Sequence, residues 1–164
     1  MKYHSKKIIS LNPEYENGAG YLLLGAVHYK APYIPFILSW PNNKEAIKYL
    51  QKAIDIKPDK HEAFNNMGIT YKDKKEYDKA IVAYQKAIDI KPDLHEAFNN
   101  MGITYKDKKE YDKAIAAYQK AIDIKPDKHE AFYNMGIAYK DKKEYDKAIA
   151  AYQKAIDIKP DFHE

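Results

Sequence analysis

Apolar residues in the greater part of the chain recur at spacings of three and four, in paired segments separated by a short polar run. Such spacing places them along one face of a helix. The run KDKKE at residues 72–76 is too polar to bury and predicts a turn between two helices. The apolar positions are Ala63, Phe64, Met67, Gly68 and Tyr71 before the turn, and Tyr77, Ala80, Ile81, Tyr84, Ala87 and Ile88 after it. Residues 57–90 are therefore predicted to form a helical hairpin.

This hairpin unit returns twice with few changes. Residues 57–90 recur as residues 91–124 and 125–158, a period of 34 residues. Self-similarity at such a period is typical of repeat proteins, in which each unit packs only on its neighbours. Residues 1–56 are interpreted as the end of a repeat helix followed by a divergent hairpin, and residues 159–164 as the start of a truncated further repeat.

The residue types at fixed positions of the unit carry a family resemblance. Phe64-x2-Met67-Gly68-x2-Tyr71 is followed by Ala80-x3-Tyr84, Ala87 and Pro92, and the same set recurs within residues 98–126 and 132–160. This pattern resembles the tetratricopeptide repeat (TPR). Small residues fall where two helices must approach closely, and large ones where neighbouring hairpins interlock. The resemblance implies an all-α fold, a right-handed TPR superhelical solenoid of antiparallel helical hairpins.

Local signals predict how the first helix of each unit begins and ends. Asp59, with Glu62 three residues later, predicts a capping box at the helix start. At the turn the TPR family commonly has glycine, whereas this chain has Lys75, Lys109 and Lys143. A left-handed conformation at a lysine costs on the order of 1 kcal/mol.

The divergent hairpin contains an apolar, proline-rich insertion at residues 31–41. Three prolines, at positions 32, 35 and 41, preclude an ordinary helix through it. One interpretation is a cap that folds back over the first hairpin. The other is an apolar hook for a partner, formed by Tyr33, Phe36 and Trp40.

Composition narrows the function classes. The net charge is +4, no residue is cysteine, and lysines are interleaved with acids throughout, so a mixed, solvated surface is expected rather than a nucleic-acid-binding stripe. No apolar run approaches the roughly 18 to 20 residues that span a bilayer, and no signal peptide is recognisable. A cytoplasmic protein without a membrane span is expected.

Candidate chemistry is sparse. Histidine followed by glutamate recurs once per unit, at His61, His95, His129 and His163. Equivalent positions on packed helices lie about 10 Å apart, whereas the ligands of one metal ion lie within roughly 2 Å of it. Serine occurs only at positions 5, 10 and 39, and no glycine-rich phosphate loop is present. We expect no metal, no cofactor and no enzymatic activity.

A binding function remains, and the resemblance implies which residues form the binding site. In TPR proteins the first helix of each hairpin lines a concave groove that receives a peptide or a partner's helix. Asn65 and Asn99 are candidates to hydrogen-bond a peptide main chain, and Tyr133 offers an aromatic surface. The alternative is that these are simply soluble positions of recently duplicated repeats. The groove candidates are Glu62, Asn65, Ile69, Lys72, Asp73, Glu96, Asn99, Ile103, Lys106, Asp107, Glu130, Tyr133, Ile137, Lys140 and Asp141.

Three functions are compatible with these sequence features. The first is a protein–protein interaction scaffold or adaptor. The second is a structural module that forms a homo-oligomer through an uncovered C-terminal helix at residues 145–158, by end-to-end stacking or helix swapping. The third is an accessory domain of a larger enzyme or transporter. A TPR clamp for chaperone C-terminal carboxylates is disfavoured, because the chain has no arginine and places glutamates where the clamp needs a cation.

Overall fold

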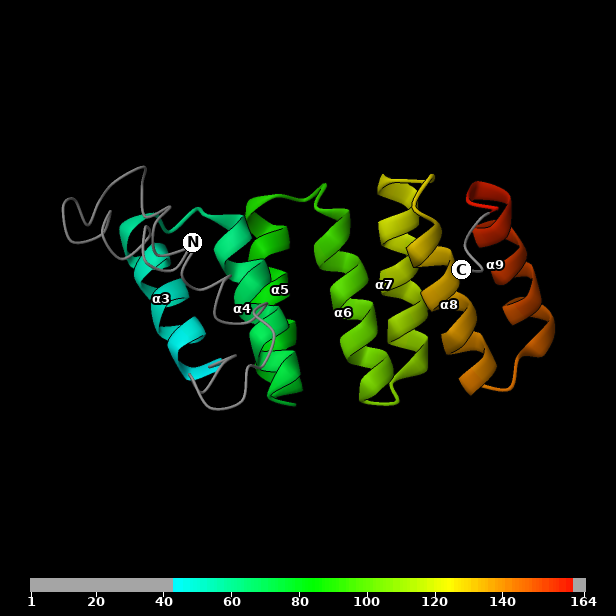
Figure 1. The fold of residues 1–164 in the computed structure, drawn as a ribbon, viewed down its shortest axis with the longest axis horizontal. Coiled ribbons are helices and arrows are strands. Elements are labelled where there is room, and N and C mark those ends of the chain that lie inside the picture. Colours follow the sequence, from blue (N-terminus) through cyan, green and yellow to red (C-terminus); the bar gives the residue numbers. More distant parts are fainter. Residues whose placement is uncertain (1–42, 161–164) are drawn as a thin grey trace, which may run out of the picture. The chain divides into compact units, whose positions relative to one another are not determined.

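The computed structural model describes residues 43–160, which contain seven helices and no strand (Figure 1). The helices are α3 (Asn43–Ile56), α4 (His61–Asp73), α5 (Tyr77–Ile90), α6 (His95–Asp107), α7 (Tyr111–Ile124), α8 (His129–Asp141) and α9 (Tyr145–Ile158). The predicted helical hairpins are confirmed as α4–α5, α6–α7 and α8–α9. The insertion at residues 31–41, with Tyr33, Phe36 and Trp40, and the truncated repeat after residue 160 lie outside the described residues. None of the described helices is both long and apolar enough to cross a membrane.

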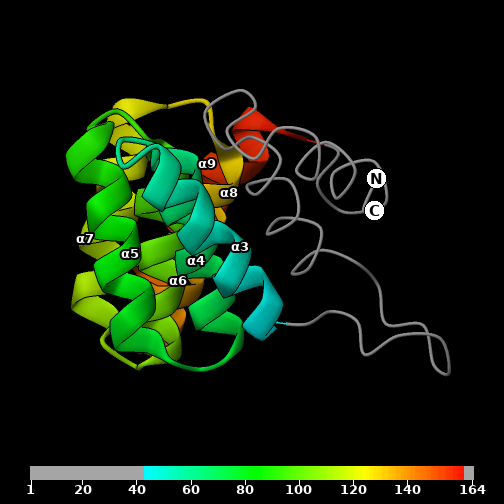
Figure 2. The ribbon, with the colours of Figure 1, turned by 90° about the vertical axis from the view of Figure 1, so that its left-hand side faces the viewer.

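The chain divides into two compact units, Met1–Lys91 and Pro92–Glu164. In the first unit α4 packs against both α3 and α5 (Figure 2). Leu50 of α3 is fully buried in this core, and Phe64 and Tyr71 of α4 pack against the core with part of their surface exposed. The core residues are Leu50, Ala53, Ile54, Ala63, Met67 and Ala83. Burial of this apolar surface is the main force that holds the three helices together.

In the second unit α7 packs against α8 and so joins the hairpins α6–α7 and α8–α9. Tyr118 of α7 lies in the centre of this core with no exposed surface. Its neighbours in the cluster are mostly alanines, which let the helices approach closely. The cluster comprises Ala114, Tyr118, Ala121, Ile122, Ala131, Met135, Ala138 and Ala151.

Glycine in the first helix of each hairpin marks a close approach to a tyrosine of the second. A Cβ atom on Gly102 would lie 2.5 Å from Cε1 of Tyr118, and the same contact recurs between Gly68 and Tyr84. Carbon atoms in protein interiors pack at about 3.5 to 4.0 Å. The ring therefore occupies the space that any side chain at Gly102 would need, as the sequence predicted for the small residues.

The turn between the helices of each hairpin passes through a left-handed lysine. Lys75, Lys109 and Lys143 have φ angles of 60°, 63° and 65°. In hairpin α4–α5 the Lys75 N–H donates to the Lys72 carbonyl at 2.8 Å, and the Glu76 N–H donates to the Tyr71 carbonyl at 2.9 Å. This pair of bonds is the Schellman motif, which satisfies the last carbonyls of the first helix. Each of the three lysines therefore bears the conformational cost that the sequence attached to a left-handed lysine at this turn.

The predicted capping box is wrong. Helix α4 begins at His61, its N-cap is Lys60, and no side chain caps it. The Lys60 N–H donates to the carbonyl of Lys57 at 3.3 Å, so Asp59 lies inside the turn that precedes the helix. Asp59 is therefore one residue too early for its carboxylate to act as the N-cap.

Candidate functional site

Within the second unit, the first helices α6 and α8 lie close enough for a direct side-chain contact. The amide Nδ2 of Asn134 donates to Oδ1 of Asn99 at 3.2 Å. Each helix buries a stripe of small and apolar residues and leaves the predicted binding residues half-buried or exposed. We call these residues the first-helix surface: Glu96, Asn99, Ile103, Lys106 and Asp107 of α6, with Glu130, Tyr133, Ile137, Lys140 and Asp141 of α8.

Two of the predicted residues have a second role in the structure. Ile103 packs partly against the core cluster of the second unit. Asn99 accepts the hydrogen bond from Asn134 through its carbonyl oxygen, which leaves its own Nδ2 as the group that can donate to a ligand. Ile103 therefore offers less apolar surface to a ligand, and Asn99 fewer hydrogen-bonding groups, than the sequence suggested.

Helix α4 presents the equivalent residues in the first unit. Glu62 and Asp73 are exposed, whereas Asn65, Ile69 and Lys72 are half-buried. The predicted site residues of α4 therefore reach solvent within their own unit.

On α6 the charged groups of the first-helix surface lie beside their sequence neighbours. Lys106 Nζ lies 3.4 Å from Asp107 Oδ1. His95 Nε2 lies 3.2 Å from Glu96 Oε1. Each helix contributes two carboxylates and one lysine, so this surface carries a net negative charge.

Tyr133 stands where α4 and α6 have asparagine, and it joins two surfaces. The side chain is 40 % exposed. Its ring centroid lies 5.6 Å from that of Tyr152 on α9, with the planes tilted by 48°. Aromatic pairs at this separation attract one another. Tyr133 therefore links the first-helix surface to α9.

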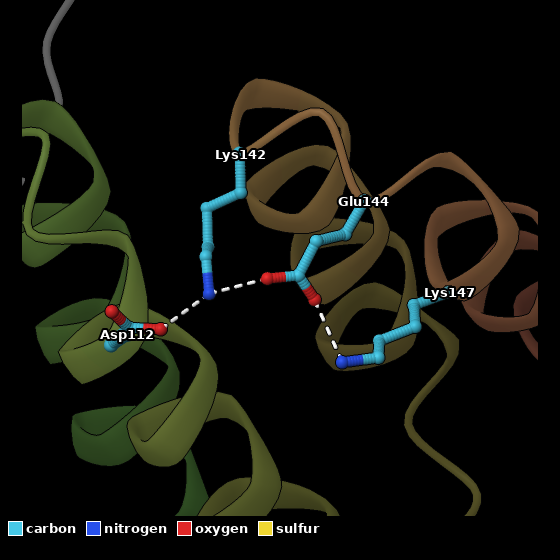
Figure 3. Close-up of polar contacts among 4 residues, drawn as sticks. All are labelled: Asp112, Lys142, Glu144 and Lys147. Atoms are coloured by element: carbon cyan, nitrogen blue, oxygen red, sulfur yellow. Dashed lines mark hydrogen bonds and ion pairs between the residues drawn. The ribbon is translucent and has the colours of Figure 1, made fainter.

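An ion-pair network that the sequence pattern did not predict ties the two hairpins of the second unit together (Figure 3). Lys142, at the end of α8, has its Nζ 2.6 Å from Oδ1 of Asp112 on α7 and also contacts Glu144. Glu144 in turn lies 2.8 Å from Lys147 Nζ. We call these four residues the Lys142 network. The mixed charges of KDKKEYDKA were the only signal for it in the sequence.

The Lys142 network shifts the ionisation of its own members. Hydrogen bonds from Lys142 and then Lys147 hold the pKa of Glu144 below its ordinary value of 4.5. The carboxylates of Asp112 and Glu144 raise the pKa of Lys142. Glu76 and Glu110 are held in the same way by lysines of their own hairpins. All these groups remain charged near neutral pH.

Acid is expected to destabilise the second unit through Glu144. Because its pKa is lower in the folded chain, its contribution to stability is present above about pH 4.5 and is lost as the pH falls through the folded-state pKa. We expect the urea midpoint to fall between pH 5 and pH 3 by less in Glu144→Gln than in the wild type. Asp112→Asn should lower the midpoint at pH 7, and 0.5 M NaCl should reduce that effect.

Asp123→Asn is the control for this prediction. Asp123 is exposed and accepts a hydrogen bond from Gln119 on its own helix, outside the Lys142 network. If the urea midpoint of Glu144→Gln fell between pH 5 and pH 3 by as much as that of the wild type, Glu144 would not be a source of the acid sensitivity.

The first unit contains a cavity of about 450 Å³ bordered by helices α3, α4 and α5. Lys79 and Lys86 lie 5.6 and 5.7 Å from the ring centroids of Tyr71 and Phe64, so lysines flank it. Val82, 57 % exposed, stands where the other repeats have alanine. The lining residues are Gln51, Ile54, Phe64, Met67, Tyr71, Asp78, Lys79, Val82, Ala83 and Lys86.

Metal-binding groups do not converge in residues 43–160. No three histidine, aspartate or glutamate side chains in this range are placed to hold one ion. Within this range the recurring histidines His61, His95 and His129 instead lie beside the glutamates that follow them, with His129 Nδ1 3.2 Å from Glu130 Oε2.

Sequence comparison identifies the family. Models of the tetratricopeptide repeat match residues 42–60, 61–94, 83–116 and 129–162, and a model described as TPR repeat matches residues 104–142. The chain belongs to the tetratricopeptide repeat family. A search of curated proteins found no match.

Solved structures share the TPR fold. A crystal structure of MamA is 28 % identical, with a TM-score of 0.81 over 97 % of this chain and 86 % of that one. MamA 41-end from Desulfovibrio magneticus RS-1 is 22 % identical, with a TM-score of 0.73 over 88 % and 77 %. A chain of the APC/C hetero-tetramer Cut9-Hcn1 is 22 % identical, with a TM-score of 0.76 over 90 % and 28 %. The all-α TPR solenoid is thus established, a fold typical of interaction scaffolds.

Proposed function

We propose that this TPR chain is a protein–protein interaction scaffold that binds a peptide or helix of a partner on its first-helix surface. The observation that supports this proposal is the direct contact between α6 and α8, which makes their outward residues one continuous surface. Apart from Ile103, which packs partly against the core, that surface lies off the stripe of fully buried residues of both helices.

The chemistry of the surface suits a polypeptide. The Nδ2 group of Asn99 can donate to a main-chain carbonyl, and the half-exposed ring of Tyr133 provides an apolar anchor nearby on α8. The excess of carboxylates over lysines favours a segment that carries basic residues. The solved relative Cut9-Hcn1 shows a protein of this fold within a hetero-tetramer.

Selection from a random peptide library, followed by affinity measurement on variants, tests the proposal. Peptides selected on the wild-type chain are expected to bind Asn99→Ala and Tyr133→Ala about tenfold more weakly, a loss of about 1.4 kcal/mol each. The urea midpoints of both variants should stay near that of the wild type, because neither residue is buried. Fluorescence anisotropy with labelled peptides measures the affinity.

Gln119→Ala, an exposed change on the second helix α7, is the matched control and should leave binding unchanged. If the selected peptides instead lose affinity for Val82→Lys and not for Asn99→Ala or Tyr133→Ala, the ligand site is the cavity of the first unit and the proposal is wrong.

A further inference from the structure

The cavity of the first unit lies apart from the predicted groove residues of α4. Its lining on that helix comes from Phe64, Met67 and Tyr71, which belong to the core of the unit or pack against it. None of the predicted groove residues of α4 lines the cavity. Its other walls are α3 and α5. The cavity is therefore a different site from the one proposed above.

The size and lining of the cavity suit a small molecule. Its volume is about 450 Å³, and small-molecule sites in proteins span about 300 to 1,000 Å³. Six of its ten lining residues are apolar or aromatic, and they include two aromatic rings and the thioether of Met67. Such a lining stabilises a bound hydrocarbon group by removing it from water.

Val82 distinguishes this cavity from the equivalent place in the second unit. Helices α5 and α9 differ in sequence only at this position, where α9 has Ala150. The Val82 side chain is 57 % exposed. Valine in place of alanine adds apolar surface that a ligand in the cavity would bury. The first unit therefore offers an apolar ligand more contact than the second unit does.

One amine at the cavity has no carboxylate partner. Lys79 is paired with Glu76, its Nζ lying 2.7 Å from Oε2 of the glutamate. Lys86 has its Nζ 5.7 Å from the ring centroid of Phe64 and makes no ion pair with any residue in the range 43–160. Asp89, three residues further along α5, accepts a hydrogen bond from a glutamine of that helix instead. The Lys86 amine is thus available to an anionic ligand.

The charged groups of α5 stand at the two ends of the apolar part of the cavity. Asp78 and Lys79 line it near the start of the helix, Val82 and Ala83 follow, and Lys86 lies at the far end. Asp78 and Lys86 are about 12 Å apart along the helix axis at 1.5 Å per residue. An anionic group is repelled by Asp78 and attracted by Lys86, which fixes the orientation of a bound amphipathic anion.

We propose that the cavity of the first unit binds a small aliphatic carboxylate, the anion of a fatty acid. Its carboxylate pairs with Lys86, and its hydrocarbon chain lies against Val82, Phe64 and Met67. One amine without a partner matches one negative charge, whereas a phosphate group requires several donors. This site shares no residue with the first-helix surface, so the two proposals fail independently.

The apolar insertion of the chain itself is a poorer match to the cavity than such an anion. Residues 31–41 contain several large apolar side chains but no aspartate or glutamate. If they filled the cavity, the amine of Lys86 would lose water without gaining a carboxylate, which is unfavourable. A fatty acid anion supplies both the apolar group and the negative charge.

Titration of decanoate into the whole chain, labelled with ¹³C at the methionine methyl groups, tests the proposal by NMR. Met67 lines the cavity, and Met135 holds the equivalent position in the second unit. We expect the Met67 methyl resonance to shift along a saturable curve, with an apparent Kd at least several-fold lower than that at Met135. Decylammonium, which has the same chain length and the opposite charge, should bind about fivefold more weakly or worse.

Two variants and their matched controls assign the site. Lys86→Gln should weaken decanoate binding about fivefold and remove the preference for decanoate over decylammonium. Val82→Asp, which places a carboxylate in the apolar part of the cavity, should abolish decanoate binding. The equivalent exposed changes in the second unit, Lys120→Gln and Ala150→Asp, should leave the Met67 titration unchanged.

Four results would overturn the proposal. The first three are absence of a saturable shift at Met67, the same titration curve at Met67 and Met135, and equal affinity for decanoate and decylammonium. The fourth is a shift in the fluorescence emission of Trp40, the only tryptophan, in Val82→Asp without ligand. That result would show that residues 31–41 of the chain occupy the cavity instead.

Discussion

Gly102→Ala is expected to lower the free energy of unfolding by about 2 kcal/mol, although alanine is the better helix former. The new Cβ would lie 2.5 Å from Cε1 of Tyr118, a ring with no exposed surface. Overpacking of this kind costs up to about 3 kcal/mol, while the change from glycine to alanine within a helix gains about 1 kcal/mol. The net loss should appear as a lower urea midpoint.

Gly136→Ala provides the matched comparison, because the new Cβ would meet the equivalent tyrosine ring, which is less tightly packed. Its Cβ would lie 2.6 Å from Cε1 of Tyr152, whose ring is partly exposed and can move outward. We expect less than half the loss seen at Gly102. The double change Gly102→Ala with Tyr118→Leu should recover part of the lost stability. Equal losses at the two glycines would show that the Tyr118 ring is not the obstacle.

Glycine at the three turn lysines is expected to stabilise the chain by about 1 kcal/mol per site, and by about 3 kcal/mol when Lys75, Lys109 and Lys143 are all replaced. The φ angles of these lysines, 60° to 65°, lie in the left-handed region, where a Cβ atom crowds the following carbonyl. Glycine has no Cβ and adopts this conformation without that cost. Urea unfolding of the single and triple variants measures the gain.

The alanine variants at the same positions separate backbone strain from charge. Lys75→Ala, Lys109→Ala and Lys143→Ala remove the same positive charges but keep the Cβ atom. We therefore expect them to leave the free energy of unfolding close to that of the wild type. A gain from alanine as large as that from glycine would assign the effect to charge repulsion in the KDKKE turn instead.

Local interactions explain why so much of the fold was predictable. The spacing of Phe64, Met67 and Tyr71 fixes one buried face of α4, and the polar KDKKE run fixes the turn, since both depend on residues near in sequence. Gly68 was predicted to allow a close approach, and the contact with Tyr84 confirms it. Because the unit recurs in the sequence, the same argument predicts each of the described hairpins.

The cap of α4 was not predictable in the same way. Asp59 has the residue type and the spacing of an N-cap, but the helix starts after Lys60 because the preceding backbone forms its own turn hydrogen bond. Two local arrangements compete there within a few residues, and their free energies differ too little for residue type alone to decide.

The sequence by itself determined the repeat, the helical hairpins, the polar turns within them and the choice of first helices as candidate binding elements. Only the tertiary structure decided which identical residues are buried or exposed. Tyr118 is buried and Tyr152 partly exposed although their helices have the same sequence, and Lys142 reaches Asp112 although thirty residues separate them. The physical reason is that burial and ion pairing depend on the neighbouring hairpin, whereas helix and turn formation depend on the residues of one hairpin alone.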